Sequence, residues 1–375
     1  MGIYESLGVR RIINAQGRYT ILGGSLLSQD VINAMAEAAR SYIDIYELQR
    51  QVGRRLAEAT RNEAAYVCNG ATAGLFLTTL ACMTGTDSQA IARLPSLVGL
   101  KNEVIIHRTH RVPLDLAIGL SGARLIEIGN VLQTTAEELE GAINERTAAV
   151  VYMPGEFFSI GVLTLANTIR IAHSHNVPVI VDAAGELPPV ENLWHFTGDL
   201  GADLAVFCGG KDLSGPQSSG LIVGRTNLIE ACFLNGPPHT RLARTMKVGK
   251  EEIIGLLAAV EAYIKTDHNA RRANFEAITK YWASSFKGLK GVNIKSPSVN
   301  GMRERIPRVK IEIDPTLTGF SATELRQLLL EGEPSIAIEH PLNTSFIFLS
   351  PETLERGDEQ IVAERLKEVF KQIQL

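Results

Sequence analysis

The feature that most constrains the fold of this chain is a regular alternation, between residues 65 and 223, of short apolar runs with helical patterns. Runs rich in β-branched residues predict strands, and segments with helical periodicity separate most of them. Strands that are apolar throughout favour a mainly parallel sheet covered on both faces. The expected strands are Ala65–Cys68, Val104–His107, Leu125–Ile128, Ala149–Met153, Val177–Val181, Leu204–Cys208 and Leu221–Val223, and the expected helices include Tyr46–Ala59, Thr72–Met83, Pro113–Leu120, Ala136–Ile143 and Thr164–His175.

The two ends of the chain do not show this alternation of strands and helices. Residues 1–30 read as irregular and glycine-rich, with Ser28 capping a helix that starts near Val31. A long helix begins at Glu251, and beyond it an α+β pattern follows. We therefore predict two domains, an N-terminal arm and large domain at residues 1–270 and a small α+β domain at residues 271–375. The small domain is expected to hold a helix at Asn274–Phe286, strands at Val309–Ile313 and Ser345–Leu349, and a closing helix at Asp358–Gln374.

Composition limits the function classes. With 45 % hydrophobic and 21 % charged residues, the chain has ordinary globular usage. No basic block offsets the net charge of -4, so the sequence predicts no DNA or tRNA surface and no membrane attachment. No apolar run reaches the roughly 20 residues that cross a bilayer. The four cysteines lack CxxC spacing and the N-terminus lacks a secretory signal, so we expect a reduced, cytoplasmic protein.

Ligands of parallel sheets bind at the carboxyl ends of the strands, so the residues that follow each strand matter most. Leu204–Cys208 ends at two glycines and delivers Lys211 into a loop. Partial desolvation leaves more of an amine neutral and able to attack a carbonyl, although a solvated loop lysine is the structural alternative. Asp182 ends another apolar strand. A protonated ring nitrogen is one partner that would keep it charged, and an N-cap role is the alternative.

Two further strand ends carry candidates. Gly70, Ala71 and Thr72 open directly onto a helix, where small side chains let a phosphate approach free backbone amides, or simply permit a tight turn. The segment lacks GxGxxG and Walker A patterns, so NAD and ATP have no fingerprint here. His110 follows the next strand and can lie flat against a planar ring, or belong to a polar loop. Together with Asp182 and Lys211, these sites fit one cofactor, pyridoxal 5'-phosphate (PLP).

The order of these residues, and the 29-residue step from Asp182 to Lys211, resemble the aminotransferase-like superfamily of fold type I PLP enzymes. The segments Gly209–Gly220, Gly220–Gly224 and Arg241–Glu251 resemble more closely the bacterial L-seryl-tRNA selenium transferase (selenocysteine synthase) group and its short relatives, the D-glucosaminate-6-phosphate ammonia-lyases. The resemblance implies an α/β fold with a mainly parallel large-domain sheet and a smaller α+β C-terminal domain. It also implies at least a homodimer.

The resemblance further implies a PLP-dependent lyase that acts on a small amino acid or amino sugar acid by α,β-elimination. Lys211 would hold PLP as a Schiff base and remove the α-proton, and Asp182 would keep the ring protonated, with His110 as the third catalytic residue. Racemase, aldolase or desulfurase chemistry would use the same residues. The expected cofactor contacts are Gly70, Ala71, Thr72, His110, Asp182, Lys211, Gln217 and Ser218, and the candidate substrate anion sites are Arg111, Arg244 and Lys247.

Three alternatives stay open. β-Replacement of the L-seryl-tRNA selenium transferase type is the first. The resemblance argues against it in part, because enzymes of that type are longer chains with an extra N-terminal domain and need a phosphate-binding surface. A non-catalytic PLP-fold binding protein is the second, and the intact Lys211 and Asp182 argue against it. The third, a metal enzyme built on His173 and His175, is disfavoured because residues two apart on a helix face different directions. We therefore expect no metal. Arg303, Arg305 and Arg308 are further candidates for substrate contacts in the small domain.

Overall fold

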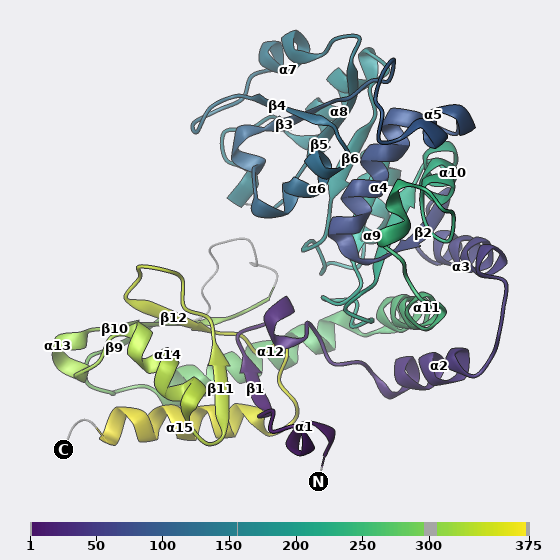
Figure 1. Ribbon diagram of the computed structural model, residues 1–375. Helices are drawn as coiled ribbons and strands as arrows, with labels where there is room; N and C mark the ends of the chain where they lie inside the picture. Colours follow the sequence, from purple (N-terminus) through teal and green to yellow (C-terminus); the bar gives the residue numbers. More distant parts are fainter. Residues whose placement is uncertain (1, 156, 296–305, 373–375) are drawn as a thin grey trace. The chain divides into compact units, whose positions relative to one another are not determined.

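The computed structural model describes residues 2–155, 157–295 and 306–372 of the 375-residue chain. Contacts divide the chain into two compact units, each shown in Figure 1. The large unit is Ser25–Thr266, and the small unit joins Met1–Gly24 to Asp267–Leu375. This division groups the N-terminal segment with the C-terminal residues, whereas the sequence analysis grouped it with the large domain.

The large unit is built on a seven-stranded sheet with the strand order β2-β8-β7-β6-β5-β3-β4. β8 runs antiparallel to both its neighbours, and the other pairings are parallel. The predicted, mainly parallel sheet is therefore confirmed, and all seven predicted strands are present with ends within two residues. The strands are β2 (Ala64–Cys68), β3 (Glu103–His107), β4 (Arg124–Ile128), β5 (Thr147–Tyr152), β6 (Val179–Asp182), β7 (Leu204–Cys208) and β8 (Gly220–Gly224).

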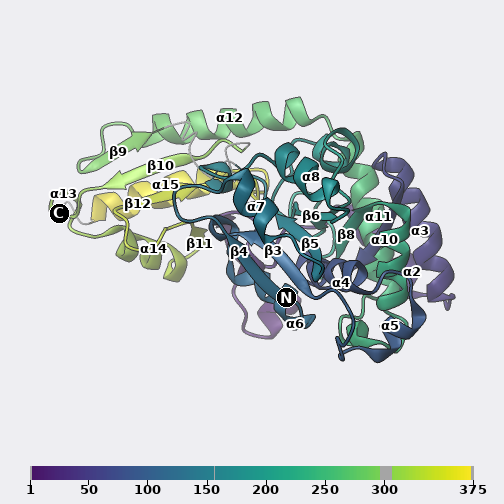
Figure 2. The same cartoon turned by 90° about the horizontal axis from the view of Figure 1, so that it is seen from above.

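Helices cover both faces of this sheet, as Figure 2 shows from above. Along β2, Ala65 and Val67 join one buried cluster while Tyr66 and Cys68 join the other, because successive strand side chains point to opposite faces. One face packs against α3 (Ile45–Ala59), α8 (Leu165–Ser174) and α11 (Lys250–Lys265), and the other against α4 (Gly70–Thr84), α6 (Leu116–Leu120) and α10 (Thr226–Asn235).

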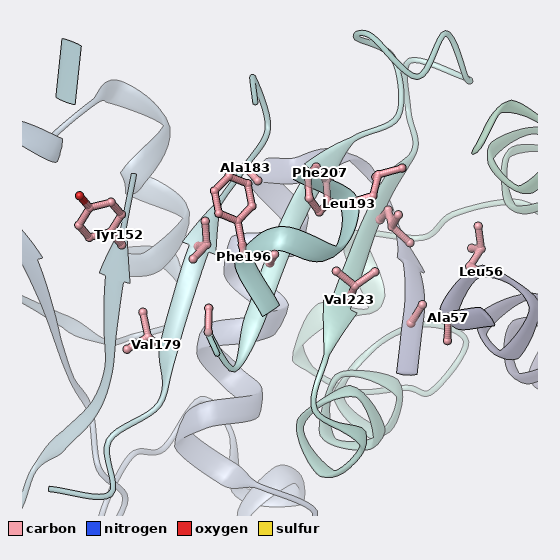
Figure 3. Packing of buried hydrophobic residues seen from close by; sticks show 14 of the residues in the cluster. Leu56, Ala57, Tyr152, Val179, Ala183, Leu193, Phe196, Phe207 and Val223 are labelled. Atoms are coloured by element: carbon pink, nitrogen blue, oxygen red, sulfur yellow. The ribbon is translucent and has the colours of Figure 1, made fainter. Parts of the chain in front are cut away.

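The first of these clusters extends to a short helical segment, α9 (Asn192–Trp194), and the π-turn at His195–Asp199 that follows it. Figure 3 shows Leu193 and Phe196 of this segment close to Phe207 of the sheet. The remaining elements of the large unit include α2 (Gln29–Ala39), α5 (Ser88–Arg93) and α7 (Ala136–Ala142). The Ser28 hydroxyl accepts a hydrogen bond from the Val31 amide, so the predicted N-cap of α2 is confirmed.

The small unit has its own core and two sheets. One is antiparallel, in the order β12-β10-β9, and the other pairs β1 with β11 in parallel. The expectation that residues 1–30 are irregular is therefore wrong at β1. Its elements are α1 (Ile3–Ser6), β1 (Ile12–Ala15), α12 (His268–Ser285), β9 (Val292–Lys295), β10 (Val309–Ile313), α13 (Pro315–Thr318), α14 (Ala322–Glu331), β11 (Ser335–Ile338), β12 (Phe346–Leu349) and α15 (Asp358–Gln372), with a 3₁₀ turn at Thr20–Leu22.

A buried ion pair between Arg18 and Glu352 adds a second tie between the two ends of the chain, inside the small unit. β1 escapes a sequence-based prediction because it is four residues long and its partner lies far along the chain. Within the described ranges, no helix combines the length and the apolar character that a membrane span requires.

Candidate active site

The register of the large sheet brings several strand ends to one edge. Cys68 at the end of β2 and Cys208 at the end of β7 both lie opposite Gly220, where the antiparallel β8 begins. Asp182 at the end of β6 lies opposite Val206 of β7. Because neighbouring strands carry these residues at the same edge, the loops that follow them converge.

Lys211 lies in the turn between β7 and β8, which backbone hydrogen bonds hold at both ends. The Gly209 amide donates to the Ser219 carbonyl at 2.8 Å, and the Gly215 amide donates to the Gly209 carbonyl at 2.8 Å. The Ser214 amide donates to the Lys211 carbonyl at 3.0 Å, which closes the turn on the lysine itself. Lys211 is half-buried. Its backbone is therefore held in place by the turn, while part of the residue stays accessible to solvent.

The structure brings Asp182 and Lys211 together. One Asp182 carboxylate oxygen accepts a hydrogen bond of 3.1 Å from the Ala184 amide. Burial raises the pKa of the Asp182 carboxyl, while the Ala184 hydrogen bond and the positive charge of Lys211 act in the opposite direction. A Cβ built on Gly185 would lie 4.0 Å from the Lys211 Nζ. The lysine amine therefore lies against the backbone that follows Asp182.

The residues Gly70, Ala71 and Thr72 form the first turn of α4, at the same edge. Gly70 has a φ of +76°, which favours glycine. The Asn69 side chain does not cap the helix, so its oxygen leaves the first amides of α4 unoccupied. A Cβ at Gly220 would lie 2.7 Å from the carbonyl carbon of Gly70, so β8 can begin there only with glycine. The Asn69 side chain instead donates to the Lys247 carbonyl at 3.0 Å.

His110 is fully buried in a 3₁₀ turn after β3, and backbone groups occupy both its ring nitrogens. Its Nδ1 accepts from the Met153 amide at 3.3 Å, which leaves Nε2 as the N–H that donates to the Phe158 carbonyl at 3.0 Å. Burial lowers the pKa of His110 to about 4, against a smaller opposing effect of the Phe158 hydrogen bond. The ring is therefore neutral, and its position is fixed next to the end of β5.

Sequence reasoning missed His107, the last residue of β3. It is fully buried, and neither ring nitrogen has a hydrogen-bond partner among the described residues. Burial, together with the neighbouring His110, lowers its pKa to about 3. The rings of His107, His110 and Tyr152 meet edge to face, with centroids 4.7 to 5.6 Å apart. An apolar strand ending in histidine was the only sequence signal of this packing.

The remaining predicted residues lie in several environments. Gln217 and Ser218 are exposed in the loop before β8. Arg111 forms ion pairs with Asp115 at 2.5 Å and with Glu127, so carboxylates of the protein already engage its guanidinium. Arg244 and Lys247 are exposed, and the Asn69 contact places the backbone of Lys247 beside the first turn of α4.

The other candidates are of two kinds. Arg303 and Arg305 lie outside the described residues. Arg308 belongs to the small unit, where it pairs with Glu339 at 2.8 Å and lies over the ring of Phe348. In the large unit, His173 Nε2 lies 2.8 Å from a carboxylate oxygen of Asp203, away from the carboxyl ends of the strands.

Comparison with known proteins places this arrangement in a family. The family described as L-seryl-tRNA selenium transferase matches residues 12–283. A 5'-C-glycyluridine monooxygenase-decarboxylase from Streptomyces sp. is 36 % identical over 98 % of this chain and 92 % of its own length. A D-glucosaminate-6-phosphate ammonia lyase from Salmonella typhimurium is 32 % identical over 98 % and 97 %. An L-seryl-tRNA(Sec) selenium transferase from Aquifex aeolicus is 30 % identical over 68 % of this chain, which spans 59 % of that protein.

Solved structures agree with the fold. A structure of D-glucosaminate-6-phosphate ammonia-lyase matches with a TM-score of 0.86 and 29 % identity, covering 100 % of both chains. An aspartate aminotransferase from Thermotoga maritima, at 17 % identity and a TM-score of 0.54, covers 99 % of this chain and 94 % of its own. A serine palmitoyltransferase from S. paucimobilis with bound PLP, at 14 % identity and a TM-score of 0.60, covers 96 % and 88 %. The predicted aminotransferase-like fold type I is therefore confirmed, and the chain belongs to the L-seryl-tRNA selenium transferase family.

Proposed function

We propose that this protein is a PLP-dependent lyase that removes ammonia from a small amino acid or amino sugar acid by α,β-elimination. One observation carries the proposal: Asp182 and Lys211 lie together at the sheet edge where α4 presents its first turn. A carboxylate for a ring nitrogen, an amine for an aldehyde and backbone amides for a phosphate are the groups that bind this cofactor.

The residues at this edge fit PLP. Gly70 and Gly220 leave the first turn of α4 clear of side chains, and no described side chain caps that turn, so its amides can donate hydrogen bonds to a phosphate. Burial makes an ionised Asp182 costly without a cation, and a protonated pyridine nitrogen would supply one. Lys211 would bind the aldehyde. When bound, PLP supplies an electron sink for the charge that develops at the substrate α-carbon.

Each residue then has a role in the reaction. Lys211 would take the α-proton of the substrate, and the hydrogen bonds at both ends of its turn hold its backbone in place for this role. Asp182 would keep the ring nitrogen of bound PLP protonated, and the ring would then withdraw electrons from the substrate. His110 exchanges no proton in this scheme, because two backbone groups fix its neutral ring. Its contribution is to fix the backbone of Met153 and Phe158, which follows β5.

The relatives support a small-molecule substrate. The ammonia lyase and the monooxygenase-decarboxylase match almost the whole of this chain, whereas it spans 59 % of the Aquifex aeolicus transferase. The net charge of -4 also gives no sign of the basic surface that a protein needs to bind tRNA phosphates. β-Replacement of the transferase type is thus the second candidate, with Lys211 and Asp182 in the same roles.

We further propose that the protein forms a homodimer or a larger homo-oligomer and works in the cytoplasm. Large apolar side chains are exposed along residues 26–46, which a second copy of the chain would cover. They include Leu26, Ile32, Tyr42, Ile43 and Tyr46. All four cysteines are free thiols, in keeping with a reducing compartment.

The test is a visible absorption spectrum of the purified protein before and after borohydride, for the unmodified chain, Lys211→Ala and the exposed-lysine control Lys265→Ala. We expect a yellow band that borohydride bleaches, with a stable lysine adduct in the unmodified chain and the control only. Release of ammonia and a keto acid is then assayed with D-glucosaminate 6-phosphate and with the enantiomers of serine. A protein that is colourless and takes up no added PLP overturns the proposal.

A further inference from the structure

The turn that carries Lys211 has no room for side chains at the two residues that precede the lysine. A Cβ built on Gly209 would overlap the Ser219 side chain and lie 2.9 Å from the Ser219 carbonyl oxygen. A Cβ built on Gly210 would lie 2.5 Å from the Cα of Gln217. The two sides of the turn are therefore packed backbone against backbone, so a shift of one side displaces the other.

A side chain from each end of the large unit contacts one neighbour of Lys211. The Ser25 hydroxyl donates a hydrogen bond of 3.2 Å to the Gly210 carbonyl, and Ser25 is the first residue of that unit. The Tyr263 hydroxyl donates a hydrogen bond of 2.5 Å to Asp212, and Tyr263 lies in α11, near the other end of the unit. The residues on both sides of the lysine are thus tied to segments that are remote in the sequence.

The two contacts differ in their exposure to water. Tyr263 and Asp212 are both buried, whereas the hydrogen bond of Ser25 is only part-buried. A buried hydrogen bond to a carboxylate is stronger than one between a hydroxyl and a carbonyl that water can reach. Tyr263 should therefore contribute more to the position of the turn than Ser25.

The amine of Lys211 reaches the loop after Asp182 from this turn. Its Nζ lies 4.0 Å from the position that a Cβ would take on Gly185. Because a lysine amine stands at the end of a flexible four-carbon stem, its place depends on where the backbone directs that stem. A misplacement of a reacting group by about 1 Å can slow a reaction by about 10²-fold. The contacts that hold the backbone of Lys211 therefore bear on the reaction rate.

We propose that Ser25 and Tyr263 are positioning residues for Lys211; this rests on the function proposed above, in which Lys211 takes the α-proton. Each acts through a neighbour of the lysine, Ser25 through the Gly210 carbonyl and Tyr263 through Asp212. Together they hold the backbone of the lysine so that its amine keeps one direction. Neither hydroxyl exchanges a proton with the substrate in this scheme.

The first experiment compares Tyr263→Phe and Ser25→Ala, as full-length proteins loaded with PLP, with the unmodified chain. The controls are the partly exposed Tyr281→Phe and Ser174→Ala, whose serine hydroxyl donates to the Ile171 carbonyl in α8. In the ammonia-release assay, we expect kcat to fall by about 10- to 100-fold in Tyr263→Phe and by about three- to tenfold in Ser25→Ala. KM and the PLP Kd should change by less than about threefold, because the contacts act through the lysine alone.

A second measurement needs neither PLP nor turnover. Formaldehyde with cyanoborohydride methylates accessible lysine amines of the apo-protein, and peptide mass spectrometry gives the rate at each lysine. Lys211 is half-buried, and the exposed Lys101 serves as the internal control. We expect Tyr263→Phe to raise the methylation rate of Lys211 by about threefold or more, because a loosened turn exposes the amine. The rate at Lys101 should stay unchanged.

Three results overturn the positioning role. They are a kcat in both variants equal to that of their controls, an unchanged methylation rate at Lys211 in Tyr263→Phe, and a rise in KM or PLP Kd that accounts for the lost activity. The last would show a general loss of the site. If the unmodified chain binds no PLP, the proposed function fails, and the methylation rates still decide whether Tyr263 holds Lys211.

Discussion

The hydroxyl of Tyr263 in α11 donates a hydrogen bond of 2.5 Å to a carboxylate oxygen of Asp212, the residue next to Lys211. Both side chains are buried. The following residue, Leu213, belongs to the apolar cluster between the sheet and α11. The turn that carries Lys211 is thus fixed to a long helix by a polar contact and an apolar one.

Tyr263→Phe removes the donor and leaves a buried carboxylate with one hydrogen bond fewer. We expect the free energy of unfolding to fall by about 1–3 kcal/mol, measured by urea denaturation of the apo-protein. The partly exposed Tyr281→Phe is the matched control and should change it by less than about 0.5 kcal/mol. Equal effects in the two variants would show that the Asp212 contact contributes nothing.

Gly220→Ala introduces a Cβ 2.7 Å from the Gly70 carbonyl carbon and 2.9 Å from the Cys68 sulfur. Backbone atoms at this distance cannot move aside at low energetic cost. We therefore expect the free energy of unfolding to fall by about 2 kcal/mol or more and the affinity for PLP to weaken. Gly141 lies in α7, where a new Cβ meets nothing within 4 Å. Gly141→Ala should instead raise the free energy of unfolding by about 0.5–1 kcal/mol, because alanine has the higher helix propensity. Thermal unfolding and PLP titration of both variants measure the contrast.

Asp182→Asn tests the electrostatics of the site in the apo-protein. Because burial raises the pKa of this carboxyl above its unfolded value, its contribution to stability is present at acid pH and lost as pH rises through the folded pKa. The variant should therefore be more stable than the unmodified apo-protein at pH 7, and the difference should close on acidification. Paired denaturation curves from pH 4 to 8 measure it, and a difference that grows toward acid would contradict the sign.

The two buried histidines predict an acid-sensitive fold. Their folded pKa values of about 4 for His110 and about 3 for His107 lie below the ordinary value of 6.5. The contribution of the two neutral rings to the free energy of unfolding is fully present above pH 6.5 and falls as pH drops, because the unfolded chain then binds protons that the folded chain does not bind. Histidine NMR signals of both rings should stay unshifted from pH 8 to 5. His107→Phe should reduce the acid slope of stability by about one proton, and an unchanged slope would argue against His107.

Much of the large unit could be predicted from local sequence, because its strands are buried on both faces. An apolar, β-branched run such as Leu204–Cys208 is then a strong signal, and the residues that follow it fall at the edge of the sheet where the parallel strands end. Lys211 and Asp182 could be singled out for this reason. The register confirms that their strands end side by side.

Other features depend on contacts that no local pattern records. Arg111 looks like a free cation in the sequence, and its pairing with Glu127 requires β4 to lie beside β3. Glu186 resembles an ordinary loop acid in the sequence, and only the folded structure shows that it is buried. The β-branched residues of β1 gave too short a signal to be recognised.

The pairing of β1 with β11 also orders events during synthesis. Ile12–Ala15 is synthesised before the large unit, and its partner Ser335–Ile338 only after it. The intervening unit can close its own core while the first strand waits with its edge unpaired. The small unit is therefore completed last, and a nascent chain stalled between Thr266 and Ser335 carries the whole large-unit sheet together with an unpaired β1.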